Sequence, residues 1–438
     1  MLIFENIWWV LVLIGVMILV HELGHFWAAR YFDVRVETFS FGFGPRLFGF
    51  RRGETDYRLS AILFGGYVKM AGEQPGEENA ADPRGFLAKP RWQRLIIAFA
   101  GPFMNVVLAV ALLTGLFMVR YPKQSESTPG VLGHVLPNSA AGRAGLREGD
   151  RIVEIDGNPN PGWEDILMKE LAGAGRPMQV TVEREGRRLS VAVTPELDKR
   201  NGVGVAGWTE QAEIQIVSLA AGGAAESAGL RKSDVLLSVG GQPIRSTHKL
   251  REVVRAGGGK PVEILYSRDG LREKVAVQPV LTTVEGQQAW LIGVYLAPRV
   301  VFTSLSFPDA VTESTRQNMK SAVMIFQFLR GIVEQRMSPR SLEGPIRIAQ
   351  LSGDAAREGP TAFLGLMAMV SLNLAIFNLL PIPILDGGVI LLLLVEMLLR
   401  HDLSLRVKEA AIKVGFVFLM AVVMFVLYND ISKILPPG

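Results

Sequence analysis

Two histidines and a glutamate interrupt an apolar stretch near the start of the chain, ILVHELGHFW at residues 18–27. His21 and His25 are four residues apart, so a helix presents both imidazoles on one face with Glu22 beside them. In the pattern H-E-x-x-H the imidazoles bind Zn²⁺ and the glutamate acts as a general base. Two buried histidines held by hydrogen bonds are the alternative. A charge at the centre of a membrane helix costs about 2.5–3.5 kcal/mol, which favours a metal site.

A zinc site of this kind needs a third protein ligand and keeps its fourth position for water. The chain has no cysteine and only five histidines, and those outside the motif lie away from the apolar spans. Carboxylates are therefore the candidates. Asp386 stands at the break in NLLPIPILDGG (378–388), where an interrupted helix can turn it inward. Glu396 is the competitor, although we expect it to snorkel to the cytoplasmic edge of the membrane.

Membrane helices are the elements that must position these residues. The chain has 438 residues, of which 49% are hydrophobic, and a net charge of +4. This composition is typical of a membrane protein with polar parts, and no dense basic block suggests nucleic-acid binding. Three regions are apolar enough to span a bilayer. A fourth is interrupted by prolines and glycines, and we interpret it as one broken span, with two full spans as the alternative.

The positive charges near the spans predict the orientation. Lys and Arg gather after the first span and before the last, so both of these segments are expected in the cytoplasm. The N-terminus, residues 120–360 and the C-terminus are then external. The N-terminal stretch lacks a basic segment and a small-residue cleavage signal, so it is predicted to be an uncleaved anchor rather than a signal peptide.

The external segment contains a repeat. Residues 140–160 and 224–244 align at a constant offset of 84, with nine of 21 positions identical. Each copy is followed by an expected helix and a pair of alternating strands, at 162–172 and 178–193 in the first copy and at 246–256 and 262–277 in the second. A repeat of this length is a domain rather than a solenoid unit.

The repeated pattern AGL-x-x-GD-x-I-x-x-I-x-G resembles a PDZ domain, with Ser233 in place of its glycine in the second copy. PDZ domains bind an extended peptide by strand addition beside a helix. A purely structural role, as a spacer or size filter, is the alternative. After the repeats, the apolar face of residues 322–333 predicts a helix on the membrane surface or packed against a PDZ copy.

The segment between the first two spans has the pattern of a β-hairpin. Leu47–Phe50 and Tyr57–Leu63 are expected strands around a turn, and Gly65 and Gly66 permit a bend or a close backbone approach. A free edge strand near the metal could pair with an unwound substrate.

Three motifs occur in order along the chain: HELGH, GPFMN at 101–105, and N-x-x-P-x-P-x-LDG ending at Gly387. Together they resemble the site-2 protease family of intramembrane zinc metalloproteases. With two PDZ copies between the second and third spans, the chain is most similar to the bacterial RseP group of that family. The group has a membrane re-entrant hairpin where we expect the strands, and many members have histidine at the position of Val389.

The resemblance implies the roles of the site residues. It makes His21, His25 and Asp386 the zinc ligands and Glu22 the catalytic base. Other residues, Asn378, Asn373, Gly65 and Gly66, would contact the substrate backbone. Hydrogen bonding between helices is the alternative for the two asparagines and is favoured for Asn373.

The implied protein is a polytopic α-helical membrane protein with about four transmembrane helices, one broken, a cytoplasmic-side re-entrant β-hairpin and two tandem external PDZ (α+β) domains. The expected divisions are 1–31, first span; 32–92, cytoplasmic-side hairpin segment; 93–119, second span; 128–206 and 212–282, PDZ domains; 283–360, external linker with an amphipathic helix; 361–400, broken span; and 410–429, last span. It would reside in the bacterial inner membrane and cleave a single-span protein, such as an anti-sigma factor already trimmed by a first protease.

Two other classes of protein fit parts of the sequence. A membrane-anchored PDZ adaptor with a structural metal site would tolerate the loss of Glu22. A divalent-metal transporter or sensor could also place His and Asp inside its spans. Such a transporter would favour several exchangeable sites and repeated spans, which the sequence does not indicate.

Overall fold

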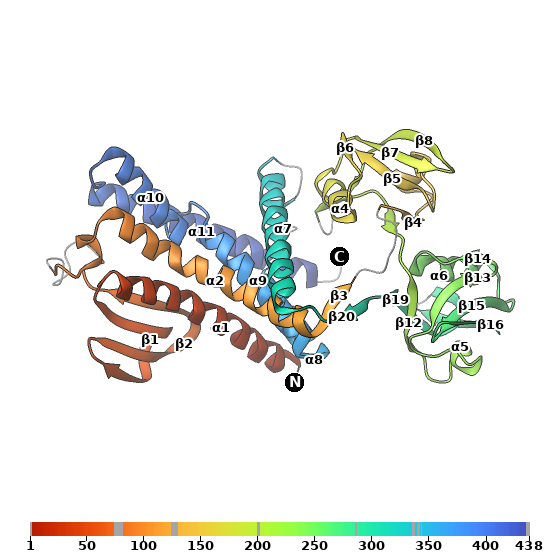
Figure 1. Ribbon diagram of the computed structural model, residues 1–438, viewed down its shortest axis with the longest axis horizontal. Coiled ribbons are helices and arrows are strands. Elements are labelled where there is room, and N and C mark those ends of the chain that lie inside the picture. Colours follow the sequence, from red (N-terminus) through yellow and green to blue (C-terminus); the bar gives the residue numbers. More distant parts are fainter. Residues whose placement is uncertain are drawn as a thin grey trace. The chain divides into compact units, whose positions relative to one another are not determined.

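The computed structural model describes residues 2–73, 82–123, 130–198, 202–284, 287–334, 338–339, 342 and 344–434 (Figure 1). The chain divides into two compact units. A helical unit combines Met1–Tyr121, Ser304–Gln327 and Leu342–Gly438, and a β-rich unit combines Pro122–Thr303 with Phe328–Ser341.

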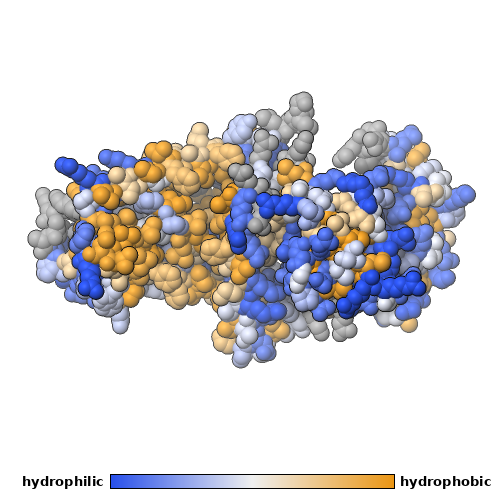
Figure 2. All heavy atoms as spheres, turned by 90° about the horizontal axis from the view of Figure 1, so that it is seen from above, coloured by the Kyte–Doolittle hydropathy of each residue, from blue (hydrophilic) through white to orange (hydrophobic). Residues whose placement is uncertain are grey.

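Four helices of the helical unit are long and apolar enough to cross a membrane, among the described residues. They are α1 Leu2–Tyr31, α2 Arg91–Arg120, α9 Pro360–Asn378 and α11 Leu405–Ile434. Hydrophobic side chains cover most of the visible face of the helical unit, whereas the β-rich unit is mainly hydrophilic (Figure 2). The helical unit is therefore that of a membrane protein, as predicted.

A break in the fourth apolar region separates α9 from the shorter helix α10, Asp386–Leu399. A Cβ atom on Gly387 would lie 2.3 Å from the carbonyl oxygen of Leu380, and one on Gly388 would lie 2.2 Å from that of Ile382. These glycines therefore let α10 begin directly against the preceding turn. Both α9 and α10 pack on α2 and follow one another along it (Figure 1).

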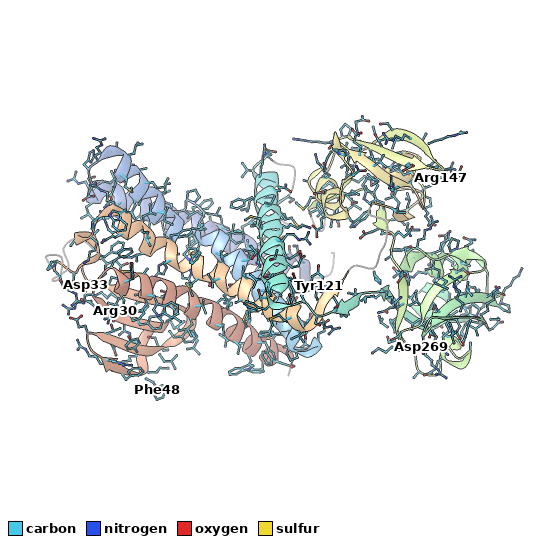
Figure 3. All side chains as sticks on the ribbon, in the orientation of Figure 1. Arg30, Asp33, Phe48, Tyr121, Arg147 and Asp269 are labelled. Carbon is cyan, nitrogen blue, oxygen red and sulfur yellow. The ribbon has the colours of Figure 1, made fainter. Side chains whose placement is uncertain are left out.

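A long antiparallel hairpin follows α1, formed by β1 Val36–Arg52 and β2 Thr55–Met70. Both strands extend well beyond the residues predicted from their alternating pattern, because the glycines and register shifts within β1 and β2 allow pairing to continue. The base of the hairpin packs on α1 and α2 in a small core of Ala29, Val34, Val36, Phe39, Val68, Met70 and Ile97. Its tip is exposed, and Phe48 points away from α1 there (Figure 3).

The stretch predicted as a linker is more structured than expected. It contains two helices, α7 Phe307–Val333 and α8 Pro345–Glu358. The prediction placed the helix containing residues 322–333 on the membrane surface or against a PDZ copy. In the structure Ala322 and Ile325 pack on a core that includes Ala109 of α2. The prediction was therefore wrong for this part of α7 but right for its end, since residues from Phe328 onward belong to the β-rich unit and Ile332 and Val333 line a pocket with Ala174 and Thr194 of the first α+β domain.

The first α+β domain of the β-rich unit has a central sheet of order β6-β5-β7-β8 beside a core of buried aliphatic residues. Its elements are β4 Leu132–Val135, α3 Ala140–Arg143, β5 Arg151–Ile155, β6 Asn158–Pro159, α4 Trp163–Ala172, β7 Met178–Arg184, β8 Arg187–Val193, β9 Glu196–Asp198, β10 Val203–Val205 and β11 Trp208–Glu210.

The second α+β domain has a sheet of order β16-β15-β13-β12-β19, with β14 paired to β13. Its elements are β12 Ile214–Leu219, α5 Ala224–Ser227, β13 Val235–Val239, β14 Gln242–Pro243, α6 Thr247–Ala256, β15 Val262–Arg268, β16 Leu271–Val277, β17 Val280–Val284, β18 Gln287–Leu291 and β19 Val294–Pro298. Two short strands, β3 Tyr121–Lys123 and β20 Val301–Thr303, pair with each other.

The predicted helix and strand pair are present in both domains. Each domain also contains its own ion pair, formed by a buried aspartate and an arginine. The carboxylate of Asp150 accepts two hydrogen bonds from Arg184, both 2.7 Å long, and Asp234 accepts the same pair from Arg268. Ser233 has φ +75°, close to the +89° of Gly149 at the matching position, so the second copy keeps the turn without its glycine.

The sequence-based limits of the two domains end too early. Strand β11 pairs with β4, so the first domain extends past residue 206. Strand β19 pairs with β12, so the second extends past residue 282. In each case the missed strand is short and closes against a strand far away in sequence, which local alternation does not reveal. The predicted start at residue 128 lies outside the described residues.

Candidate metal centre

The structure brings His21, His25 and Asp386 together inside the helical unit. The two Nε2 atoms of the histidines are 3.2 Å apart. The carboxylate oxygens of Asp386 lie 3.1 Å from His21 Nε2 and 3.4 Å from His25 Nε2. The histidines come from one face of α1, and the aspartate is the first residue of α10, directly after the break. Three candidate ligand atoms from two distant segments thus converge on one point.

Helix α2 holds the other nitrogen of each imidazole. The carbonyl oxygen of Ile97 accepts a 2.8 Å hydrogen bond from His25 Nδ1, and the side-chain amide of Asn105 lies 3.3 Å from His21 Nδ1. With Nδ1 protonated, the neutral imidazole leaves the lone pair of Nε2 free for a cation. Metal-binding histidines commonly have such a partner on their second nitrogen.

Glycines allow α2 to approach the histidines. A Cβ atom on Gly101 would lie 2.3 Å from His25 Nε2 and 2.9 Å from His21 Cε1. A Cβ atom on Gly24 would lie 2.3 Å from the carbonyl oxygen of Ala100. The imidazoles therefore lie directly against the α2 backbone, which explains why small residues are required on both helices.

The donor set fits zinc. Two imidazole nitrogens and a carboxylate oxygen are three ligands that zinc accepts in sites with an open fourth position. With metal–ligand bonds of about 2.0–2.2 Å, the ligand atoms of a tetrahedral site are about 3.3 Å apart. The Nε2 atoms, 3.2 Å apart, and the distances of 3.1 Å from His21 to Asp386 Oδ2 and 3.4 Å from His25 to Asp386 Oδ1 are close to this spacing. Without a cation, lone pairs and a carboxylate would face one another in a buried site, which is unfavourable.

Glu22 lies between this cluster and the hairpin. A Cβ atom on Gly66 would lie 3.2 Å from Glu22 Cγ and 3.0 Å from both Ile18 Cγ2 and the carbonyl oxygen of Ser40. At Gly65, where φ is +137°, a Cβ atom would overlap the Phe43 ring. Gly66 thus lets β2 lie beside α1 at the level of Glu22, whereas Gly65 makes room for the Phe43 ring within the hairpin.

The two predicted asparagines are not part of this cluster. Asn373 and Asn378 are both half-buried on α9, and Asn378 is its last residue. Among the described residues, neither side chain has a recorded hydrogen bond to the histidines or to Asp386.

Glu396 is buried, whereas the prediction had its side chain extending to solvent. Its side chain is 1% exposed, and its carboxylate lies 2.6 Å from Lys408 Nζ and accepts a hydrogen bond from the backbone N–H of Leu403. The prediction of a snorkelling side chain was wrong because α11 supplies a cation beside α10. Glu396 is nevertheless outside the cluster of three ligands.

The contacts that orient the histidines were not predicted from the sequence. Ile97 acts through its backbone, so no side-chain pattern could reveal it. Asn105 was noted in the sequence only as the last residue of the GPFMN motif. A signal was available in the sequence, since Gly101 and Asn105 are four residues apart and therefore lie on the same face of α2, as His21 and His25 do on α1.

A second group of donors lies in the β-rich unit. His134 Nδ1 is 2.8 Å from Glu148, and with Glu252 these residues place three candidate ligand atoms within 4.8 Å of one another. The ammonium of Lys249 lies 3.4 Å from Glu148 and 3.5 Å from Glu252. This group therefore already contains its own cation.

A family model described as Peptidase family M50 matches residues 9–422. The chain belongs to peptidase family M50. A relative from Treponema pallidum named "Putative zinc metalloprotease" is 32% identical to this chain, over 96% of this chain and 97% of the relative. The regulator of sigma-E protease RseP from Salmonella typhimurium is 31% identical, covering 97% of this chain and 98% of its own. The match to the PDZ domain of an SdrC-like protein from Listeria monocytogenes covers 20% of this chain and 90% of that domain, with 17% identity and a TM-score of 0.18.

The M50 chain is thus a membrane-embedded zinc metalloprotease, and the predicted site-2 protease family, enzyme class and metal are confirmed. The match extends over both units, so it includes the helices that carry the ligand cluster and the two α+β domains between them.

Proposed function

We propose that this M50 protease hydrolyses a peptide bond within or near the membrane span of a single-span protein, with His21, His25 and Asp386 as zinc ligands and Glu22 as the catalytic base. The observation that carries the proposal is the convergence of two Nε2 atoms, 3.2 Å apart, with the carboxylate of Asp386, whose Oδ2 lies 3.1 Å from His21 and whose Oδ1 lies 3.4 Å from His25, while Glu22 is adjacent and outside the ligand set.

Each residue has a distinct task in this mechanism. Zinc, when bound, supplies a Lewis acid that polarises a carbonyl and lowers the pKa of water to about 7. Glu22 takes a proton from the attacking water and delivers it to the leaving amine. The carbonyl of Ile97 on α2 holds the His25 imidazole in the orientation that aims its Nε2 at the metal. The surrounding helices limit access of bulk water to the reacting bond.

The hairpin would hold the substrate in an extended form. A helical substrate hides its peptide bonds, so it must unwind before cleavage. In the described residues β1 and β2 form a two-stranded sheet, and Gly66 lets β2 lie beside Glu22. Strand addition along this edge would present the scissile bond to the site. Asn378 and Asn373 are further candidates for contacts with the substrate backbone.

The hairpin's role can be tested by substituting proline for single residues of Tyr57–Met70. Proline removes one backbone donor, so substitutions on the pairing edge should block cleavage. Zinc content is the control for folding. Unchanged cleavage across the whole scan would exclude strand addition at the hairpin.

The two α+β domains are proposed to be PDZ domains that receive a peptide end or an extended segment. Support comes from a loop that both contain. Ala141 N–H donates to Ala206 in the first domain and Ala225 N–H donates to Ile292 in the second, so the loops before β11 and β19 correspond. Each loop has a glycine with positive φ, Gly207 and Gly293, a conformation that exposes backbone N–H groups to an anion.

The two loops differ in whether a carboxylate of the same domain already accepts their hydrogen bonds. In the first domain the carboxylate of Glu170 already accepts hydrogen bonds from Ala206 N–H at 2.6 Å and Trp208 Nε1–H at 2.8 Å. Burial raises the pKa of Glu170, which indicates how strongly this carboxylate is withdrawn from water. The second domain has Val254 at the matching position, 84 residues later. The second loop is therefore the better candidate for an external carboxylate.

The proposed orientation has the hairpin and the α10–α11 connection in the cytoplasm, with the termini and the PDZ domains external, in the bacterial inner membrane. Because the chain lacks cysteine, single-cysteine variants report sidedness directly. Arg187→Cys should react with a membrane-impermeant maleimide in intact cells, whereas His401→Cys should react only after permeabilisation. The reverse pattern would invert the topology.

The proposed substrate is a single-span protein of the anti-sigma-factor type that a first protease has already trimmed. The relative from Salmonella typhimurium is named "Regulator of sigma-E protease RseP", and we extend a role in sigma-factor regulation from that name to the present chain. The test compares one tagged single-span substrate with its external domain intact or removed. Faster cleavage of the trimmed form is expected, and equal rates would remove the requirement for prior trimming.

A second candidate function, a membrane-anchored adaptor with a structural metal, has the paired α+β domains in its favour. It requires no chemistry from Glu22, so it predicts that Glu22→Gln retains full function.

A further inference from the structure

Asn105 occupies an unusual position for a polar side chain. It lies on α2, one turn after Gly101, and is 0% exposed. Its side-chain amide faces His21 Nδ1 at 3.3 Å, while its backbone carbonyl accepts a 2.8 Å hydrogen bond from Ser371 Oγ on α9. The residue therefore touches the histidine with its side chain and the neighbouring helix with its backbone, two contacts that can be separated by mutation.

The hydrogen bonds available to the Asn105 amide indicate which of its two atoms faces His21 Nδ1. As placed, Nδ2 faces His21 Nδ1 and the Oδ1 atom is buried with no hydrogen-bond partner among the described residues. The two ends of a side-chain amide have nearly the same shape, so their assignment follows from the hydrogen bonds they can form. Turned by 180°, the amide directs Oδ1 at Nδ1 and accepts its proton, so the unpartnered acceptor gains the bond that it lacks.

A proton on Nδ1 of His21 is required if Nε2, on the other side of the ring, is to bind a metal. His21 Nε2 faces Asp386 and His25 Nε2, the two other candidate ligands. A neutral imidazole carries one proton, so fixing it on Nδ1 leaves the Nε2 lone pair available for a metal. For His25 the Ile97 carbonyl has this role. His21 has no backbone carbonyl recorded at Nδ1 in the described part of the chain, and Asn105 stands in that place.

We propose that Asn105 is a positioning residue that accepts the Nδ1 proton of His21 and thereby aims Nε2 at zinc. The inference rests on the proposed role of His21 as a ligand. Helix α2 then orients both histidines, one through a backbone carbonyl and one through a side chain. Partners of this kind change metal affinity by about 10–100-fold when they are removed.

The test is the zinc affinity of the full-length protein, measured by competition with a chelating dye. Asn105→Leu has the same branched arrangement of side-chain heavy atoms but no acceptor, and it should bind zinc about 10–100-fold more weakly. Asn105→Asp keeps an acceptor at the same place, and it should bind zinc at least as tightly as the parent. If Asn105→Leu does not fold, Asn105→Ala, which also lacks the acceptor and adds no volume, replaces it.

Ser371→Ala is the matched control. It removes the hydrogen bond to the backbone of Asn105 and leaves the side-chain amide in place, so zinc affinity should stay within about 2-fold of the parent. A role in packing alone predicts that Asn105→Leu keeps its affinity, or that Asn105→Asp loses as much as Asn105→Leu. Either result would overturn the proposal.

His21→Ala separates this proposal from the one on which it rests. If His21→Ala loses zinc while Asn105→Leu retains it, only the positioning role is wrong. If His21→Ala retains zinc, the ligand assignment itself has failed.

Discussion

Two clusters of imidazole and carboxylate donors occur in the described residues, one in each unit, and they differ in charge balance. In the helical unit His21, His25 and Asp386 converge without a lysine or arginine among their recorded ion-pair partners. In the β-rich unit His134, Glu148 and Glu252 are equally close together, but Lys249 lies between the two carboxylates.

This difference in charge balance predicts that the first cluster binds a metal ion more tightly than the second. Carboxylates that are already neutralised by a lysine gain little from a cation, because the metal would have to displace an existing ion pair. In the helical unit α2 also orients the imidazoles through their Nδ1 atoms, whereas Nδ1 of His134 contacts the Glu148 carboxylate, one of the donors of its own cluster. Unneutralised donors and oriented rings together favour zinc at the first cluster.

The largest expected effect is the loss of a ligand in the helical cluster. Asp386→Ala should lose its bound zinc, and cleavage of a single-span substrate should fall by about 10³-fold or more, since metal activation contributes several kcal/mol to the barrier. Glu148→Ala, in the other cluster, is the control and should retain about one zinc per chain. Equal zinc loss in the two variants would erase the distinction between the clusters.

The next effect comes from the close approach of α2. In Gly101→Ala the new methyl group would lie 2.3 Å from His25 Nε2, so the ring must move. Overpacking of this kind costs about 1–3 kcal/mol, which corresponds to zinc affinity lower by about 10-fold to 100-fold.

Gly115→Ala on the same helix is the matched control for Gly101→Ala, because a Cβ atom there has nothing within 4 Å. Parent-like zinc affinity in both variants would mean that the histidines do not depend on contact with α2.

A weaker effect should appear when the cation of the second cluster is removed. Lys249→Met keeps the length of the side chain and leaves both carboxylates without their ammonium partner. We expect this variant to bind a second zinc ion weakly, whereas the parent takes up one. Zinc titration followed by mass spectrometry under native conditions measures both. A parent that already binds two zinc ions would contradict the role assigned to Lys249.

The smallest effect concerns pH. The rings of His134 and His248 stack 5.0 Å apart, and burial, followed by the charges of His134 and Arg251, lowers the pKa of His248 from 6.5. The folded state therefore binds fewer protons than the unfolded state. The stability from neutral His248 is present above pH 6.5 and is lost as the pH falls through the lowered pKa.

His248→Phe, which keeps the stacked ring without its titration, should remove this part of the pH dependence. Thermal unfolding of the full chain in detergent, followed between about pH 5 and pH 8, measures it for both proteins. An identical pH dependence would show that His248 does not titrate in this range with a lowered pKa.

The parts of the fold that follow from local pattern could be predicted from sequence. The apolar spans, the break before Asp386 and the repeated helix and strand pair each have a periodicity or a composition of their own. Strands β11 and β19 could not be predicted, because they are short and their pairing partners are distant in the chain. The position of α7 depends on which apolar surface it meets.

The same limit applies to the site. The spacing of His21 and His25 and the unusual charge of Asp386 in an apolar span identified the candidate ligands. The contacts from Ile97 and Asn105 required the relative placement of α1 and α2, which no single segment encodes. Glu396 was misjudged for a related reason, since Lys408 is distant from it in sequence and adjacent in space.

The most direct test of the account is Glu22→Gln, with zinc and cleavage measured on the same purified protein. Glu22 is adjacent to the cluster but is not one of its three ligands. The account predicts that this variant holds about one zinc per chain, as the parent does, and cleaves a single-span substrate at least about 10²-fold more slowly. Parent-like cleavage by a zinc-loaded Glu22→Gln protein would contradict the assignment of Glu22 as the catalytic base.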